Sequence, residues 1–436
     1  MSDKISRRKF LKGAAVGGFS FLFLRNSRTA FAYEANEKLN IAIIGCGGKG
    51  GGNMGSVSGE NIVALCDIDD NITARAKENY PNALVYSDFR EMLQRKYSLI
   101  DAVVVSTPDH THAPASVMAM KMGKHCYCEK PLTWSISEAR MMRDVARKHG
   151  VATQMGNQGT AHNGLREAVE VIRSGAIGQV YEVHVWSNRP VWPQGLDRPT
   201  ERMPVPGGLH WDLWLGPAPE RPYHSCYQPF NWRGWIDFGC GALGDMGCHT
   251  VNMPFMALDL RNPIAVEAEV FEMKDETYPK QSIVEYMFPE RNGLRTLRMK
   301  WYDGGLKPPA DVLDGRDLPG SGVVLLGEKG RLFTPDDYGA RYELLPADKF
   351  VDYQKPEPTI PRSPGHHAEW IRACKGGEPA MSNFDYASAL TETILLGNLA
   401  IVTGEPIYWD AKNGKAINCP KADPYIAREY RKGWTL

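Results

Sequence analysis

Leu39-Asn40-Ile41-Ala42-Ile43-Ile44 runs directly into Gly45-Cys46-Gly47-Gly48-Lys49-Gly50, and this stretch decides the fold. The first six residues are mostly β-branched and apolar, as expected for a strand buried on both faces of a parallel sheet. Among the glycines, Gly45 permits a tight turn, Gly47 lets the backbone approach a pyrophosphate, and Gly50 allows close helix packing. The pattern predicts a strand, a turn and a helix whose N-terminal amides face phosphate groups.

A second apolar run, Ile62-Val63-Ala64-Leu65-Cys66, ends at Asp67, about 20 residues after the glycines. An acid at this position can hydrogen-bond the ribose hydroxyls of an adenosine. Because its charge repels a 2′-phosphate, the sequence predicts NAD rather than NADP as the cofactor. The predicted cofactor contacts in this part of the chain are Gly45, Cys46, Gly47, Lys49, Gly50 and Asp67.

A third buried run, Leu99–Val105, is followed by the polar segment Ser106-Thr107-Pro108-Asp109-His110-Thr111-His112. In a doubly wound sheet, ligands bind beyond the carboxyl ends of the strands. The residues therefore predicted to line the cofactor are Ser106, Thr107 and Pro108. We expect packing or hydrogen bonding near the nicotinamide half from His110 and His112. A metal site is the alternative for these histidines, but no second cluster has recognisable ligand spacing, so we predict no metal.

Two further motifs supply groups suited to moving a proton. Cys128-Glu129-Lys130-Pro131 places a lysine directly before a proline, and Asp245-Met246-Gly247-Cys248-His249 places an acid four residues before a histidine. Residues four apart share a helix face, so a helix beginning near Asp245 would point both side chains into one cavity. On spacing alone, the alternative is an Asp245 that only caps the helix and a His249 that packs in the core.

Together these motifs resemble those of the Gfo/Idh/MocA oxidoreductases, the family of glucose-fructose oxidoreductase and inositol dehydrogenase. The resemblance covers nearly all of the chain after its first 32 residues. It is carried by the glycine turn, Thr107-Pro108 with His112, Glu129-Lys130-Pro131, and Asp245 with His249. It implies that Lys130 is catalytic and that Asp245 and His249 complete the site. The residues that the resemblance adds near the cofactor are His112, Glu129 and Lys130.

The chemistry of alcohol oxidation explains why these residue types are needed. A hydride leaves for the nicotinamide C4 while the hydroxyl loses its proton, and a neutral histidine suits the second task near pH 7. His249 is therefore the predicted general base. Lys130 can stabilise the charge that develops on oxygen, and Asp245 can hold a neighbouring hydroxyl or orient the histidine.

The first 32 residues predict export. Ser6-Arg7-Arg8-Lys9-Phe10-Leu11-Lys12 is followed by a mildly apolar stretch, Gly13–Leu24, and by Ala30-Phe31-Ala32. The apolar stretch is short for a membrane span, so we interpret residues 1–32 as a twin-arginine signal peptide rather than a transmembrane or basic amphipathic N-terminus. The twin-arginine (Tat) export machinery carries folded proteins, which predicts a periplasmic or otherwise exported enzyme. We expect no other segment to be apolar enough to span a bilayer.

Composition excludes some function classes. The 51 basic and 51 acidic residues give a net charge of zero, so there is no electrostatic case for nucleic-acid binding. Nine cysteines, without paired zinc spacing, are expected to be mostly free thiols. At 436 residues, the chain exceeds one typical domain.

We predict an α/β protein with two domains after the signal peptide. Residues 38–156 form a Rossmann NAD-binding domain, and residues 157–436 form an α+β domain for substrate and oligomerisation. Gln158, just after the boundary, can face the cofactor or substrate. Alternating apolar runs predict a largely antiparallel open sheet, and the terminal segment, residues 366–403, predicts helices that pack back on the body. The predicted strands are Val180–Trp186, Ile264–Met273, Ser282–Phe288, Arg295–Trp301 and Gly322–Leu326.

An aromatic-rich insert favours a sugar substrate. Six of the eleven tryptophans lie between Trp186 and Trp235, and flat aromatic faces can cover the C–H face of a sugar, although ordinary packing is the alternative. The charged residues interleaved with them are Arg189, Arg198, His210, Asp212 and Arg233. The family resemblance also implies a homo-oligomer, a dimer or tetramer, formed through the open sheet.

Three functions remain open on the sequence. The first is an exported NAD(P)-dependent oxidoreductase that takes a hydride from a secondary hydroxyl of a sugar, glycoside or cyclitol. Its cofactor should stay tightly bound, because free NAD is scarce outside the cytoplasm. The second is an NAD-dependent glycosidase that oxidises, eliminates and reduces in one turnover. The third is a non-enzymatic periplasmic sugar-binding protein.

Overall fold

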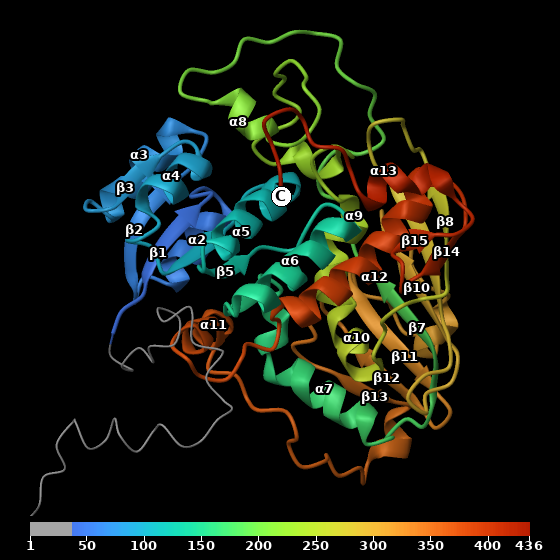
Figure 1. Cartoon of the computed structure of the whole chain (residues 1–436). Coiled ribbons are helices and arrows are strands. Elements are labelled where there is room, and N and C mark those ends of the chain that lie inside the picture. The colour runs from blue at the N-terminus through green and yellow to red at the C-terminus, as the bar shows by residue number, and fades with distance from the viewer. Residues whose placement is uncertain (1–36) are drawn as a thin grey trace, which may run out of the picture.

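The computed structural model describes residues 37–436, and its first layer is a six-stranded parallel sheet (Figure 1). The strands lie in the order β3-β2-β1-β4-β5-β6, so the chain reverses direction across the sheet between β1 and β4. This order confirms the predicted Rossmann fold. The strands are β1 Asn40–Ile44, β2 Asn61–Cys66, β3 Leu84–Tyr86, β4 Ala102–Val105, β5 His125–Cys128 and β6 Thr153–Met155. The predicted signal peptide, residues 1–32, lies outside the described residues.

Helices cover both faces of this sheet, and local sequence signals set where they begin. The helices are α2 Lys49–Ser56, α3 Asp70–Asn79, α4 Phe89–Lys96, α5 His112–Lys121 and α6 Ile136–His149. Asp69 and Asp88 accept hydrogen bonds from backbone amides at the starts of α3 and α4, and Ser135 forms a capping box with Glu138 at α6. By contrast, Gly48 precedes α2 without a side-chain cap, which leaves N-terminal amides open to a ligand.

The second layer is a nine-stranded sheet in the order β13-β12-β11-β7-β10-β9-β8-β14-β15. Strand β7 pairs with β10 in parallel and with β11 antiparallel, and the remaining pairs are antiparallel. This confirms the largely antiparallel sheet predicted for the second part of the chain. Its strands are β7 Val180–Trp186, β8 Ala265–Phe271, β9 Gln281–Phe288, β10 Leu297–Tyr302, β11 Gly322–Gly327, β12 Arg331–Thr334, β13 Glu343–Leu345, β14 Ile407–Asp410 and β15 Lys415–Ala416.

The second part of the chain also contributes helices. They are α7 Asn163–Arg173, α8 Trp211–Leu215, α9 Gly241–Thr250, α10 Asn252–Leu258, α11 His366–Cys374, α12 Phe384–Thr403 and α13 Asp423–Ile426. Short 3-10 turns are η2 Asp109–Thr111, η3 Gln158–Ala161, η4 Asn231–Gly234, η5 Ala310–Leu313, η6 Ala347–Phe350 and η7 Pro420–Ala422. The loop before α8 arches over the gap between the sheets (Figure 1).

Helix α12 joins the two layers. It packs against α6 of the first layer and against α9, β8 and β9 of the second. Its 20 residues are long and apolar enough to cross a membrane, so the prediction of no such segment after the first 32 residues was wrong. Most of the helix is buried inside the protein, and its apolar side chains, among them Leu390, Ile394 and Leu396, belong to the main core.

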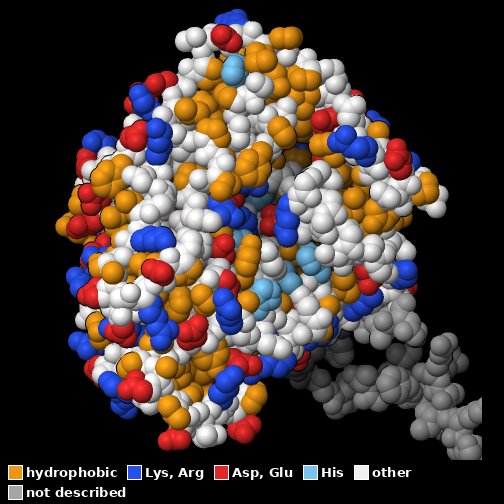
Figure 2. Space-filling view, turned by 180° about the vertical axis from the view of Figure 1, so that it is seen from behind, with side chains coloured by type: hydrophobic (Ala, Val, Ile, Leu, Met, Phe, Trp, Pro, Cys, Tyr) orange, Lys and Arg blue, Asp and Glu red, His pale blue; other side chains and the backbone are white. Residues whose placement is uncertain are grey.

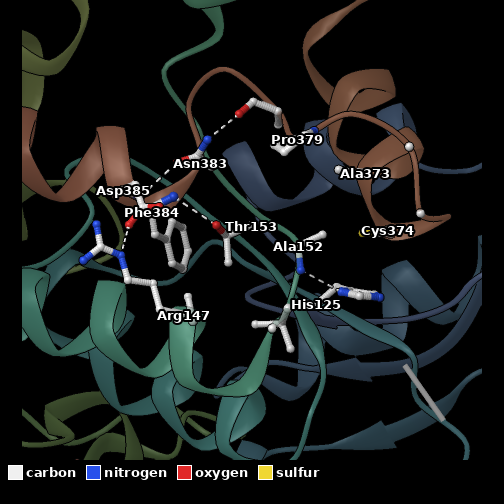
Figure 3. A pocket seen from close by; sticks show the side chains of 16 residues that line it. His125, Arg147, Ala152, Thr153, Ala373, Cys374, Pro379, Asn383, Phe384 and Asp385 are labelled. Carbon is white, nitrogen blue, oxygen red and sulfur yellow. Dashed lines mark hydrogen bonds and ion pairs between the residues drawn. The ribbon is translucent and has the colours of Figure 1, made fainter. Parts of the chain in front are cut away.

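A second junction lies where α6 ends and the connection from α11 to α12 passes (Figure 3). There the Phe384 amide donates to Thr153 Oγ1 at 2.9 Å, and Arg147 pairs with Asp385. The junction borders a cavity of about 610 Å³ at the amino ends of β5 and β6. Because ligands bind at the carboxyl ends of such strands, we assign this cavity to the packing of the terminal helices rather than to chemistry.

The glycine turn offers a direct test of the fold. A Cβ added at Gly50 would lie 1.9 Å from the Gly45 carbonyl oxygen, whereas one added at Gly52, in the same helix, meets no atom within 4 Å. We predict that Gly50→Ala lowers the free energy of unfolding by about 2 kcal/mol or more and weakens NAD binding. Gly52→Ala should be neutral or stabilise by up to about 1 kcal/mol. Chemical denaturation of both variants checks this, and equal stabilities would contradict the close helix packing.

Candidate active site

A cavity of about 1050 Å³ lies beyond the carboxyl ends of β1, β2, β4 and β5. Figure 2 shows the molecule from behind, where the surface is hollowed near its middle and basic, acidic and histidine side chains gather in and beside the hollow. The first layer supplies the glycine turn and the strand ends. The second part of the chain supplies the opposite wall, with Arg189, Trp192, Trp214, Phe230, Trp232, Arg233, Asp245, His249 and Tyr338.

Most of the predicted site residues line this cavity. They are Gly45, Gly47, Lys49, Asp67, Ser106, Thr107, Pro108, Glu129, Lys130, Gln158, Asp245 and His249. Three predicted cofactor contacts, Cys46, Gly50 and His112, do not line the cavity but support the residues that do. Cys46 donates its backbone amide to Asp67 Oδ2 at 2.7 Å, and Gly50 packs against Gly45. The His112 ring nitrogens lie 2.8 Å from the carbonyl oxygens of Thr107 and Pro131, so His112 holds two cavity-lining loops together.

His110 does not line the cavity. Its ring nitrogens lie 2.8 Å from the Trp214 carbonyl oxygen and 3.1 Å from that of Phe238, which ties the first layer to the aromatic insert. Among the described residues, no group of three or more histidine, cysteine, aspartate or glutamate side chains is placed to hold a metal ion.

Asp67, the predicted partner of the adenosine ribose, lines the cavity. Its Oδ2 accepts the Cys46 amide, and its Oδ1 accepts the Asp69 amide at 3.1 Å. Burial raises the pKa of Asp67, and these backbone hydrogen bonds act in the opposite direction. Each carboxylate oxygen has a further lone pair, so Asp67 can accept hydrogen bonds from ribose hydroxyls while it fixes the glycine turn.

The residues present fit a dinucleotide. Gly48 has a φ of +49°, and a Cβ there would point into open space beside the uncapped start of α2. The buried Thr107 Oγ1 and Gln158 Oε1 have no hydrogen-bond partner in the protein. A pyrophosphate at the amides of α2 and polar atoms of a bound dinucleotide would supply these missing partners.

Glu129 is held beside this site by a network of polar groups. Asn53 donates to Glu129 Oε1 at 2.8 Å, and the Lys49 ammonium lies 3.8 Å from the same oxygen. A Cβ at Gly156 would lie 2.5 Å from the Glu129 carboxylate. The glycine that follows β6 is therefore required for the position of this carboxylate.

The centre of the cavity is an ionic cluster of Lys130, Asp245 and Arg233. Lys130 Nζ lies 2.9 Å from Asp245 Oδ1 and donates to the Asp245 carbonyl oxygen at 2.7 Å. Arg233 Nε donates to Asp245 Oδ1 at 3.1 Å. Burial would raise the pKa of Asp245, but Lys130 and Arg233 outweigh it and hold that pKa below its ordinary value. Burial would lower the pKa of Lys130, but Asp245 raises it, so Lys130 carries its charge.

Helix α9 brings His249 to this cluster. The helix begins at Gly241 rather than near Asp245, so Asp245 lies inside it and is not a helix cap. A Cβ at Gly241 would lie 2.6 Å from the Tyr278 ring, which explains why a glycine stands at this start. Burial and the nearby Lys130 charge lower the pKa of His249 well below its usual range. The histidine is therefore neutral, and its buried Nδ1 has no partner.

Three cavity residues were not predicted from the sequence as part of the site. Arg233 was noted only as a charged residue of the insert, although its guanidinium lies 4.3 Å from the Trp232 ring and 4.5 Å from the Phe230 ring. Tyr338, from the loop after β12, packs against His249 with ring centroids 4.9 Å apart. Asp109 is buried beside Asp245. Arg233 and Asp109 lie in segments that the sequence singled out, the aromatic insert and the polar run after a strand, whereas no sequence pattern marked Tyr338.

Two models of one oxidoreductase family match the chain. Residues 39–157 match the NAD-binding Rossmann fold of the GFO_IDH_MocA oxidoreductases. Residues 170–436 match the C-terminal alpha/beta domain of that family.

Curated relatives match over shorter stretches. A glycosyl hydrolase family 109 protein of Solibacter usitatus is 31% identical over 200 residues, which are 41% of this chain and 44% of that protein. An inositol 2-dehydrogenase of Salmonella typhimurium is 28% identical over 152 residues, 34% of this chain and 45% of that enzyme. The matches therefore span less than half of these relatives.

Solved structures share the fold over a longer part of the chain. The WlbA dehydrogenase from Bordetella pertussis, in complex with NADH and UDP-GlcNAcA, superposes with a TM-score of 0.60 at 18% identity, covering 86% of this chain and 99% of that one. Aldose-aldose oxidoreductase from Caulobacter crescentus, complexed with glycerol, gives 0.56 at 17% identity, covering 86% and 100%.

The buried Asp109 predicts a pH dependence of stability. Burial and the Asp245 charge raise its pKa from 3.8 to about 7 in the folded protein. The folded state then binds the proton more tightly than the unfolded state, so this group stabilises below about pH 4 and its contribution is lost as the pH rises through about 7. Relative to the wild type, Asp109→Asn should gain on the order of 2–4 kcal/mol of unfolding free energy between about pH 4 and pH 8. Denaturation curves at both pH values check this, and a constant difference would contradict it.

Proposed function

This chain belongs to the Gfo/Idh/MocA oxidoreductase family, and on that premise we propose that it oxidises a secondary hydroxyl of a sugar, glycoside or cyclitol with NAD. The observation that carries the proposal is that Lys130, Asp245 and His249 meet in one cavity with the glycine turn and Asp67. When bound, NAD accepts the hydride from the substrate carbon. The protein supplies position, charge and a place for the proton.

Lys130 is suited to hold the reacting oxygen. An ammonium group has three N–H donors, and Asp245 accepts two of them through its carboxylate and its carbonyl oxygen. The third donor is left for the substrate hydroxyl. Because the raised pKa keeps Lys130 charged, it stabilises the negative charge that develops on the oxygen as the proton leaves.

His249 is suited to take that proton. Its pKa is lowered, so the ring is neutral at physiological pH, and its Nδ1 is free of protein partners. Tyr338 packs against the ring edge to face and fixes its plane. The Lys130 charge lowers the pKa of His249, whereas the Asp245 carboxylate raises it. Asp245 therefore favours the protonated ring that forms during the reaction.

Export and tight cofactor retention belong to the same proposal. We propose that the twin-arginine sequence directs the folded protein to the periplasm and that NAD remains bound through the reaction cycle, because free NAD is scarce there. A second carbonyl substrate then takes the hydride back. We also propose that the open face of the nine-stranded sheet joins copies of the chain into a homo-oligomer.

A redox glycosidase is the second candidate. The 31% identical relative from Solibacter usitatus is a glycosyl hydrolase family 109 protein, which favours this activity specifically. Release of the aglycone from an aryl glycoside, without net reduction of NAD, would select the glycosidase. Formation of a carbonyl product from the free sugar would select the oxidoreductase.

Substitution of the two catalytic residues tests the proposal. We predict that His249→Ala and Lys130→Ala each lower turnover by roughly 10²–10⁴-fold while NAD stays bound. His210→Ala is the matched control, because His210 pairs with Asp70 outside the cavity, and it should keep normal turnover. Steady-state kinetics and the cofactor content of each variant test this prediction. Near-normal turnover in either catalytic variant would remove that residue from the mechanism.

Cofactor retention gives a separate prediction. Protein purified without added nucleotide should release NAD or NADH on denaturation, identified by mass spectrometry. Sugar alone should then give a single-turnover rise in absorbance at about 340 nm rather than steady NADH formation. Empty protein that turns over only with added NAD would leave a conventional dehydrogenase.

A further inference from the structure

Arg189 differs from several other charged residues of the aromatic insert, each of which lies within ion-pair distance of a partner. Arg198 pairs with Glu276 and Arg233 with Asp245. His210 and Asp212 are also paired, with Asp70 and Arg431. Within residues 37–436, Arg189 has no acidic partner within ion-pair distance, and its guanidinium donates a hydrogen bond to the side-chain oxygen of its neighbour Asn188.

The structure nevertheless fixes where Arg189 lies. It follows β7, and its carbonyl oxygen accepts the Gly304 amide at 2.7 Å, while the Asn188 amide donates to Ser321 Oγ at 3.2 Å. These bonds attach the loop to the end of the nine-stranded sheet. From there the half-buried Arg189 side chain lines the active-site cavity beside Val191 and Trp192.

Arg189 faces the part of the cavity where the substrate must react. Burial and the Asp337 charge raise the pKa of Tyr338, and the Lys130 and Arg189 charges act in the opposite direction. Tyr338 in turn packs on His249. Arg189 therefore lies near enough for its charge to act on the tyrosine that packs on the proposed general base.

The charges in this half of the cavity do not balance. Lys130 and Arg233 share the Asp245 carboxylate, whereas Arg189 has no acidic side chain of the described residues within ion-pair distance. Asp337 also acts on Tyr338 but forms no ion pair with Arg189. Asp109 is protonated below about pH 7. The Arg189 guanidinium has no carboxylate from the described part of the chain beside it, and its fork of N–H donors matches the two oxygens of a carboxylate. A bound substrate can supply such an anion.

We propose that Arg189 binds a carboxylate on the substrate, so that the substrate is an acidic sugar, such as a hexuronate or aldonate, rather than a neutral one. This inference rests on the proposed oxidation of a sugar hydroxyl and names its substrate class. A carboxylate is favoured over a phosphate ester because Asp245 holds both Lys130 and Arg233, which leaves Arg189 to face the substrate's anion. One guanidinium matches one negative charge, whereas a phosphate monoester carries nearly two.

The test compares matched substrates on matched variants of the full-length protein. Glucose, glucuronate and glucose 6-phosphate, with the corresponding galactose series, are assayed on the wild type, Arg189→Gln and Arg198→Gln. Arg198 belongs to the same insert and lies outside the cavity. The wild type should prefer the acidic sugar, and Arg189→Gln should lower kcat/KM for it by roughly 10–100-fold, mainly through KM, with little effect on the neutral sugar. Arg198→Gln should change neither.

The outcomes separate this inference from the proposed function. A wild type that oxidises neutral sugars as well as acidic ones, or better, overturns the carboxylate site and leaves the oxidoreductase standing. Preference for the phosphate ester, or equal losses for all sugars in Arg189→Gln, also overturns it. Calorimetric binding of glucuronate that is lost in Arg189→Gln, without turnover of any sugar, supports the carboxylate site and contradicts the proposed function.

Discussion

The contact on which the site depends is the pair formed by the Lys130 ammonium and Asp245. Lys130 follows a strand of the first sheet, whereas Asp245 lies inside α9 of the second part of the chain. The pair therefore exists only when the two layers are docked, and both partners are largely buried. Removing two charges from water is expensive, so such a pair adds little to stability unless further hydrogen bonds satisfy it. Here Arg233 and the Asp245 carbonyl oxygen provide them.

The packing around α9 explains how the pair is held. A Cβ at Gly244 would lie 2.2 Å from the Cys240 side chain, and one at Gly247 would lie 2.8 Å from Ile394 of α12. The helix thus sits against α12, which packs in turn on α6 of the first layer. A single buried helix connects the Rossmann sheet, the nine-stranded sheet and the reacting groups. A small displacement of α12 is expected to displace α9, and with it His249 and the Asp245 partner of Lys130.

The sequence was most informative for the parts of the site that are built from residues close together in the chain. The run from β1 through the glycines to α2, and Asp67 after β2, are short-range patterns, and the structure brings them together at the strand ends. The start of α9 was misplaced, because Gly241 is selected by contact with Tyr278, which lies far away in the sequence. Tyr338 was missed for the same reason. Its loop reaches His249 because Gly159 and Gly164 let the backbone approach closely, and no local pattern shows this.

We infer that Lys130 and Asp245 act as one unit in which a carboxylate-held cation stabilises the reacting oxygen. A double-mutant cycle on kcat/KM with Lys130→Ala, Asp245→Asn and the double variant measures this most directly. We predict a coupling free energy of about 1–3 kcal/mol, so that the double variant is slower than Lys130→Ala by less than the full cost of Asp245→Asn in the wild type. Losses that simply add, with a coupling near zero, would show that the two residues act independently.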